Sequence, residues 1–98
     1  RPMIKKGDLV ECTSELALWG VETLTDVDSN SYREFDVGST FLVVDVIEEE
    51  SIRNDEVLFV YYVLMTSDGM KWLCEYTTDK MRRYTTLESI VKNELRVI

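Results

Sequence analysis

The fold follows from three apolar runs: Phe41-Leu-Val-Val-Asp-Val-Ile47, Val57-Leu-Phe-Val-Tyr-Tyr-Val-Leu-Met65 and Lys71-Trp-Leu-Cys-Glu-Tyr76. They are rich in β-branched and aromatic residues, which pack well on a pleated surface. None has the length or the period of a helix, and turn-forming residues separate them. The stretch from residue 40 to residue 76 therefore predicts three consecutive antiparallel strands, a β-meander.

The register of the last two strands depends on the turn at Asp68-Gly69. Asp-Gly favours a two-residue type I′ loop, in which both central residues have positive φ. Such a loop gives three cross-strand pairs on one face: Met65 with Trp72, Val63 with Cys74, and Tyr61 with Tyr76. We expect this apolar face to form the core, and we expect Tyr62 and Lys71 to face solvent.

Shorter elements flank the meander. Residues 9–13 alternate as a half-buried strand does, and residues 14–38 predict a long folded loop that pairs in part with itself. Thr85-Thr-Leu-Glu88 has the spacing of a helix capping box, so a short helix is expected there, before a closing strand at 95–98.

Length, net charge and residue composition exclude several classes of function. The chain has 98 residues, enough for one domain, and a net charge of −8, which argues against binding to nucleic acid or to anionic lipid. Histidine is absent, so the usual general base and the commonest metal ligand are missing. We therefore expect no catalysis, no cofactor and no metal.

The two cysteines, Cys12 and Cys74, predict free buried thiols and a cytoplasmic protein. The longest apolar run, 57–65, is about half the length that a membrane-spanning helix requires. We expect the natural chain to begin at Met3, with Arg1 and Pro2 as added residues.

The order of these elements resembles the SH3-like small β-barrel. The landmarks are Lys6-Gly7-Asp8-Leu9-Val10, Val37-Gly38 before Phe41, Asp68-Gly69 before Trp72-Leu73, and Leu95-Arg96-Val97-Ile98. The same set is similar to small proteins of tailed bacteriophages. The resemblance implies that 1–98 is a single five-stranded barrel, with a long first (RT-type) loop and one short helix before the last strand. It also implies a location in the host cytoplasm.

Peptide-binding SH3 domains use aromatic residues and an acidic RT loop, so the resemblance predicts a protein-interaction module with a basic protein partner. The expected contact residues are acidic or aromatic: Asp26, Asp28, Tyr32, Glu34, Phe35 and Asp36 in the long loop, Glu48 and Glu49 at the next hairpin, and Tyr62. The double tryptophan that holds proline-rich ligands is missing. Residues 26–34 begin like a calcium loop, but Ser31 and Val37 stand where glycine and glutamate are required, which favours a solvated loop.

Two alternative functions remain. The acidic chain could imitate nucleic acid and occupy the basic cleft of a DNA- or RNA-handling protein. A KOW-like nucleic-acid-associated domain would instead need basic loops, and the basic cluster is confined to Lys80, Arg82 and Arg83. We expect Trp72 in the core and Trp19 packed beneath the long loop.

Overall fold

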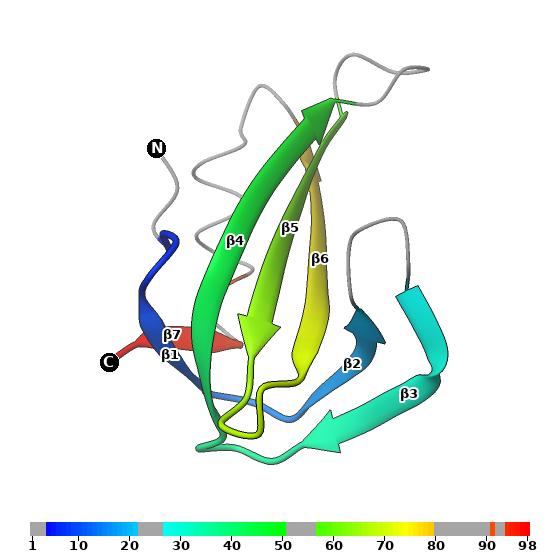
Figure 1. Cartoon of the computed structure of the whole chain (residues 1–98). Coiled ribbons are helices and arrows are strands. Elements are labelled where there is room, and N and C mark those ends of the chain that lie inside the picture. The colour runs from blue at the N-terminus through cyan, green and yellow to red at the C-terminus, as the bar shows by residue number, and fades with distance from the viewer. Residues whose placement is uncertain (1–3, 22–26, 51–56, 80–90, 92–93) are drawn as a thin grey trace.

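The computed structural model describes residues 4–21, 27–79, 91 and 94–98. These residues form seven strands, which are β1 (Leu9–Cys12), β2 (Leu16–Val21), β3 (Val27–Phe35), β4 (Thr40–Glu50), β5 (Val57–Met65), β6 (Lys71–Asp79) and β7 (Leu95–Val97). All belong to one antiparallel sheet in the order β3-β2-β6-β5-β4-β1-β7. The sheet curls into a half-barrel with β3 and β7 at its edges (Figure 1).

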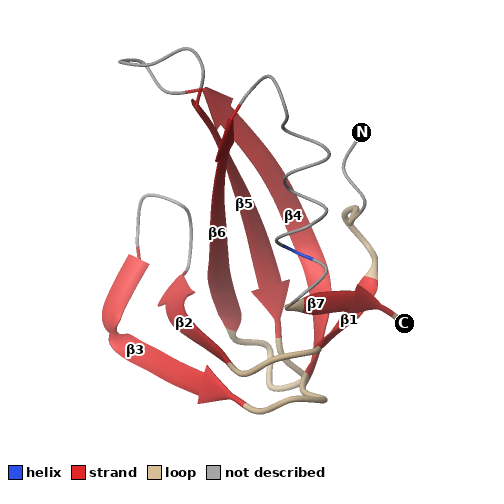
Figure 2. Cartoon of the chain, turned by 180° about the vertical axis from the view of Figure 1, so that it is seen from behind, coloured by secondary structure: helices blue, strands red, loops and turns tan. Residues whose placement is uncertain are grey.

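The structure confirms the predicted meander and the mainly β fold class. β4, β5 and β6 are consecutive antiparallel neighbours, and β7 pairs with β1, with Val10 opposite Val97. The long first loop pairs with itself, as expected, and forms the β2–β3 hairpin. The described sheet thus has two more strands than the five predicted, and both views show the β2–β3 hairpin projecting to one side of the meander (Figure 2). The expected helix falls on residues outside the described part, except for the buried Val91.

The predicted register of β5 and β6 is wrong by one residue. A type I′ turn requires positive φ at both Asp68 and Gly69. Among the described residues only glycines have positive φ, so Gly69 meets this requirement, at 85°, and Asp68 does not. The amide of Gly69 donates to the carbonyl of Thr66, and the amide of Thr66 donates to the carbonyl of Met70 (2.9 and 3.0 Å). The loop is therefore a three-residue type I turn with a glycine bulge, which pairs Met65 with Lys71 and Tyr62 with Cys74.

This shift moves Tyr62 from the expected solvent face to the core. Tyr62 is fully buried, whereas Lys71 is exposed as predicted. The side chains of one face alternate along β5 and β6 and fill the curl: Leu58, Val60, Tyr62 and Leu64 with Trp72, Cys74 and Tyr76. We call this the inner face and the opposite one the outer face.

Edge-to-face aromatic contacts close one end of the core. The Phe35 ring lies 4.9 Å from the Phe41 ring and 5.1 Å from the Trp72 ring, centroid to centroid.

A bulge in β4 between Val43 and Asp45 changes which residues of that strand face inward. Phe41 and Val43 are inward before the bulge and Val46 after it.

Two buried tyrosines differ in how their hydroxyls are satisfied. The Tyr62 hydroxyl makes no hydrogen bond in the described structure, whereas the Tyr76 hydroxyl donates to Glu94 Oε1 at 2.9 Å. Since a buried hydroxyl without a partner costs its desolvation energy, Tyr62→Phe should raise the free energy of unfolding by about 1 kcal/mol. Tyr76→Phe should lower it by about 1 kcal/mol. Urea denaturation of both variants tests this, and a loss of stability in Tyr62→Phe would contradict it.

Candidate functional site

The outer face carries a row of aromatic and aliphatic side chains. We call it the outer strip: Trp19, Tyr32, Ile47, Phe59, Tyr61, Val63 and Leu73. Cross-strand pairing makes it continuous, because Trp19 lies opposite Leu73 and Leu73 lies opposite Val63. Most of these side chains are half-buried by their neighbours on the sheet, but Trp19 and Tyr32 are 42% and 49% exposed. The strip therefore has its most accessible aromatic surface at the β2–β3 end.

Trp19 and Tyr32 form a tilted aromatic pair, with ring centroids 4.6 Å apart and an interplanar angle of 56°. The pairing of β2 with β3 shifts between Leu18 and Gly20, and the two strands come close there. A Cβ on Gly20 would lie only 2.6 Å from the Cβ of Ser31, so glycine permits this approach. The expectation that Trp19 packs beneath the loop is wrong, because the alternation of β2 directs Leu18 inward and Trp19 outward.

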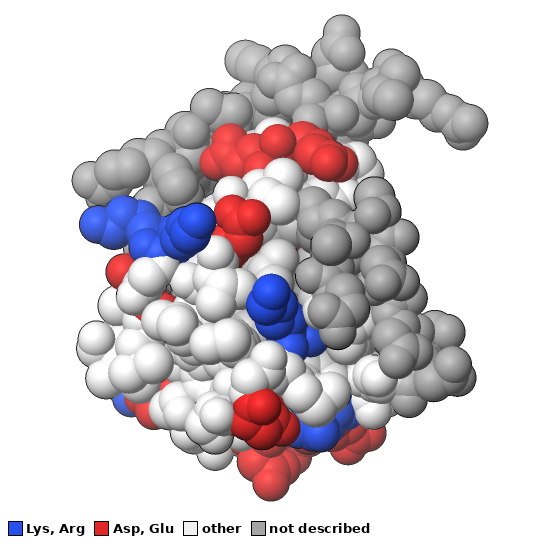
Figure 3. Space-filling view, in the orientation of Figure 1, with Lys and Arg blue, Asp and Glu red and all other residues white. Residues whose placement is uncertain are grey.

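Exposed carboxylates border the outer strip: Glu34, Asp45, Glu49 and Glu75. Phe59 and Tyr61 stack between them, with centroids 6.4 Å apart. Desolvation, with the nearby carboxylates of Glu75 and Glu49, raises the pKa of Tyr61, so its hydroxyl stays protonated at neutral pH. In the view of Figure 3, acidic groups gather towards both ends of the molecule and uncharged side chains fill much of the surface between them.

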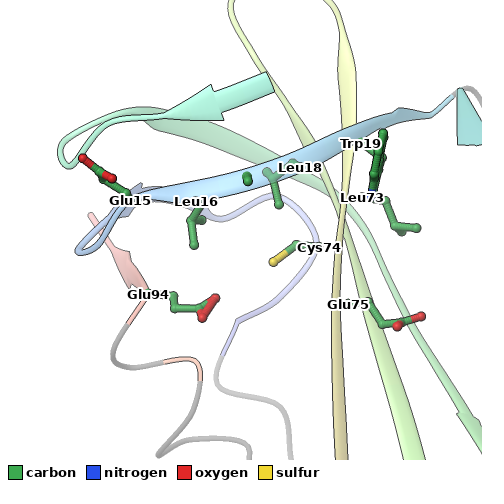
Figure 4. Close-up of a pocket in the computed structure, with 9 residues that line it drawn as sticks. Glu15, Leu16, Leu18, Trp19, Leu73, Cys74, Glu75 and Glu94 are labelled. Carbon is green, nitrogen blue, oxygen red and sulfur yellow. The ribbon is translucent and has the colours of Figure 1, made fainter. Parts of the chain in front are cut away.

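A cleft opens at one side of the strip, between β2 and β6. The two strands pair at only two positions, Trp19 with Leu73 and Gly20 with Trp72. Beyond them they diverge around a cleft of about 500 Å³, which we call the β2–β6 cleft. Its lining consists of one continuous stretch of β2 and its approach, part of β6, and one residue before β7: Glu15, Leu16, Ala17, Leu18, Trp19, Leu73, Cys74, Glu75 and Glu94 (Figure 4).

Two hydrogen bonds connect Glu94 to the chain segments on either side of the cleft. The amide of Thr13, just before β2, donates to the carbonyl of Glu94 at 2.8 Å. This bond continues the pairing of β1 with β7, in which Cys12 lies opposite Leu95. The Tyr76 hydroxyl of β6 donates to the carboxylate of the same glutamate. Glu94 thus links both sides of the cleft.

The cleft combines apolar walls with acidic side chains. Figure 4 shows Leu16, Leu18 and Cys74 directed into the space beneath β2, with Glu94 on the same side. Desolvation raises the pKa of Cys74 to about 12, so its thiol is protonated at neutral pH and is a poor nucleophile. Burial also raises the pKa of Tyr76. These groups are suited to binding through apolar contact and carboxylate charge.

The predicted contact residues are divided among several places. Tyr32 and Glu34 lie on the outer face beside Trp19, and Asp36 is exposed in the β3–β4 turn. The two glutamates of the next hairpin lie on opposite faces of β4: Glu49 is on the outer face, and Glu48 is on the inner face opposite Val60. Asp28 lies in β3, and Asp26 lies outside the described residues.

Two of the predicted aromatic contact residues were expected to be exposed, and the structure shows them buried. Phe35 is 8% exposed because it pairs with Leu16 on the inner face and packs against Phe41 and Trp72. Tyr62 is buried by the register shift described above. Sequence reasoning also missed Trp19, Glu75 and the acids of the cleft. The alternation in Leu16-Ala-Leu-Trp19 was the available signal, because it places Trp19 on the face opposite Leu16 and Leu18.

Compared with protein-family models, curated proteins and solved structures, the chain matches none of them. Within the described residues, no helix has the length and apolar character needed to cross a bilayer. The same part of the chain brings together no group of three or more side chains suited to holding a metal ion. The basic cluster at residues 80–83 lies outside the described part.

Proposed function

We propose that this protein is a non-catalytic interaction module that binds a basic segment of a partner protein through the outer strip and its bordering carboxylates. The exposed Trp19–Tyr32 pair supports this most strongly. Exposed aromatic side chains are typical of the residues that supply most of the energy of protein interfaces. Glu34 and Glu75 lie on the same face, so a basic side chain would meet both an aromatic ring and a carboxylate there.

Charge and aromatic contact would act at different stages of binding. The net charge of −8 would steer a basic partner towards the protein and raise the association rate at low salt. Burial of Trp19 and Tyr32 would then slow dissociation, and a lysine or arginine over the Trp19 ring would add about 0.5–2 kcal/mol.

The resemblance to the SH3-like barrel belongs to the same proposal. A curled antiparallel sheet is compatible with that fold class, and the β2–β3 hairpin falls within residues 14–38, the stretch that the resemblance assigns to the long first loop. A bacteriophage origin and action in the host cytoplasm are the corresponding predictions for its setting.

Capture of partners from a bacterial lysate tests the proposal. We expect Trp19→Ala, and separately Glu34→Gln with Glu75→Gln, to reduce the amount of the main bound protein by about three- to tenfold. Binding should also weaken between about 50 mM and about 500 mM salt, because the Debye length falls below the spacing of surface charges. Mass spectrometry identifies and quantifies the captured proteins.

A matched control changes the same number of charges elsewhere. Asp36→Asn with Glu48→Gln removes two carboxylates from the β3–β4 turn and the inner face, and should leave capture unchanged. Equal losses in both double variants would contradict a site on the outer face. If the captured proteins handle nucleic acid and are displaced by duplex DNA, imitation of nucleic acid becomes the better explanation.

A further inference from the structure

The β2–β6 cleft interrupts an otherwise continuous sheet. Continuing the observed register would place Leu18 opposite Cys74 and Leu16 opposite Tyr76. The cleft lies between these strands instead. β6 is paired with β5 along its whole length on one side, and β2 is paired with β3 on its other side. Within the described residues, the strand edges that face each other across the cleft therefore have no strand partner beyond Trp19 and Leu73.

Unpaired strand edges attract another strand, because their amide and carbonyl groups favour hydrogen bonding. An extended peptide that adds to such an edge gains main-chain hydrogen bonds, and its alternate side chains give specificity. The outer edges of β3 and β7 offer one strand edge each, and β7 has only three residues. The cleft offers two facing edges.

The lining of the cleft specifies the side chains of such a peptide. Towards the inner face it presents Leu16, Leu18 and Cys74, which suit an apolar side chain. Towards the outer face it presents Trp19, Leu73 and Glu75. Glu15 and Glu94 add two further carboxylates, and among the described residues the lining includes neither lysine nor arginine. An extended segment has alternating side chains, so this pattern fits apolar residues alternating with basic ones.

The cleft is also preorganised. The bonds from Thr13 and from the Tyr76 hydroxyl fix Glu94 from both sides, and the three apolar wall residues are buried. A ligand would therefore not need to order these groups on binding, which lowers the entropic cost of association. A volume of about 500 Å³ lies in the usual range for ligand sites.

We propose that the β2–β6 cleft receives an extended segment of a partner protein, with apolar residues alternating with lysine or arginine, which adds to the sheet as a strand alongside β6. This inference rests on the proposed function and specifies its partner and its mode of recognition. Because β2 and β6 are antiparallel, the added strand runs parallel to one and antiparallel to the other.

A defined peptide tests strand addition directly. The probe is an acetylated and amidated peptide of about eight residues in which valine alternates with lysine. We expect it to bind the whole chain, with slowed hydrogen exchange at the amides of residues 15–18 and 74–79 in NMR spectra. Glu15→Gln with Glu75→Gln should weaken binding by about three- to tenfold at low salt.

Backbone methylation is the matched control. The same peptide, N-methylated at alternate residues, keeps its charges and side chains but loses hydrogen-bond donors, and it should bind at least about tenfold more weakly. Three results would overturn strand addition: equal binding of the two peptides, slowed hydrogen exchange at β3 or β7 in place of the cleft, or no binding. The proposed function fails separately, if Trp19→Ala and the Glu34 and Glu75 variants leave lysate capture unchanged.

Discussion

Replacing Trp72 with alanine should lower the free energy of unfolding by about 3–5 kcal/mol, the usual range for a large core aromatic side chain. Trp72 is 1% exposed and joins three parts of the fold. Its ring packs against Phe35 of β3, the Arg33 guanidinium lies 4.7 Å from its centroid, and its Nε1 donates to Thr66 Oγ1 at 3.1 Å. Alanine would leave a cavity, remove a cation–π contact and lose the bond to the β5–β6 loop.

Urea denaturation followed by circular dichroism measures this loss. Trp19→Ala is the matched control, because it removes the same side chain from the exposed outer strip and should cost less than about 1 kcal/mol. Trp72→Phe separates the two contributions at the core position, since phenylalanine keeps an aromatic ring but cannot donate to Thr66. Similar losses for the two alanine variants would contradict the assignment of Trp72 to the core and Trp19 to the surface.

The strands of the meander could be predicted from the sequence because their β-branched and aromatic composition is local information. Their register could not, because Asp68-Gly69 is compatible with loops of two lengths. The longer loop prevails here through Asp68 itself, whose Oδ1 accepts hydrogen bonds from the Met70 amide and the Thr66 hydroxyl. A shift of one residue exchanges the two faces of β5, and Tyr62 moves from solvent to core.

The candidate site depends on contacts that are more remote in the sequence. Nothing in the sequence around residue 19 indicates that β2 lies beside β6, whose strand begins about fifty residues later. The lining of the cleft also includes Glu94, which is still further along the chain. Tyr32 and Glu34 follow from the resemblance to an acidic, aromatic RT loop, but the inward direction of Phe35 follows only from its pairing with Leu16.

Stability should fall steeply as the pH rises above about 9, because the core holds several weak acids in their neutral form. Burial is the largest cause in each case: it raises the pKa of Cys12 from 9.0 to about 11, of Cys74 from 9.0 to about 12 and of Tyr62 from 10.0 to about 12. At a pH between the ordinary and the raised pKa of one of these groups, the group loses its proton in the unfolded chain and keeps it in the folded chain. Folding is therefore disfavoured progressively through that window, and below pH 9 these groups have no effect.

The size of this effect follows from proton linkage. Each group lowers the free energy of unfolding by about 1.4 kcal/mol per pH unit within its window, so Cys74 alone should cost about 4 kcal/mol between pH 9 and pH 12. Urea denaturation under reducing conditions, repeated in steps from about pH 8 to about pH 11, measures the slope. Cys74→Ala provides the control: whatever it does to stability at neutral pH, it should make the alkaline slope shallower by about 1.4 kcal/mol per pH unit. An unchanged slope in that variant would contradict this prediction, because it would mean that the Cys74 thiol, buried on the inner face of β6, ionises as readily in the folded chain as in the unfolded one.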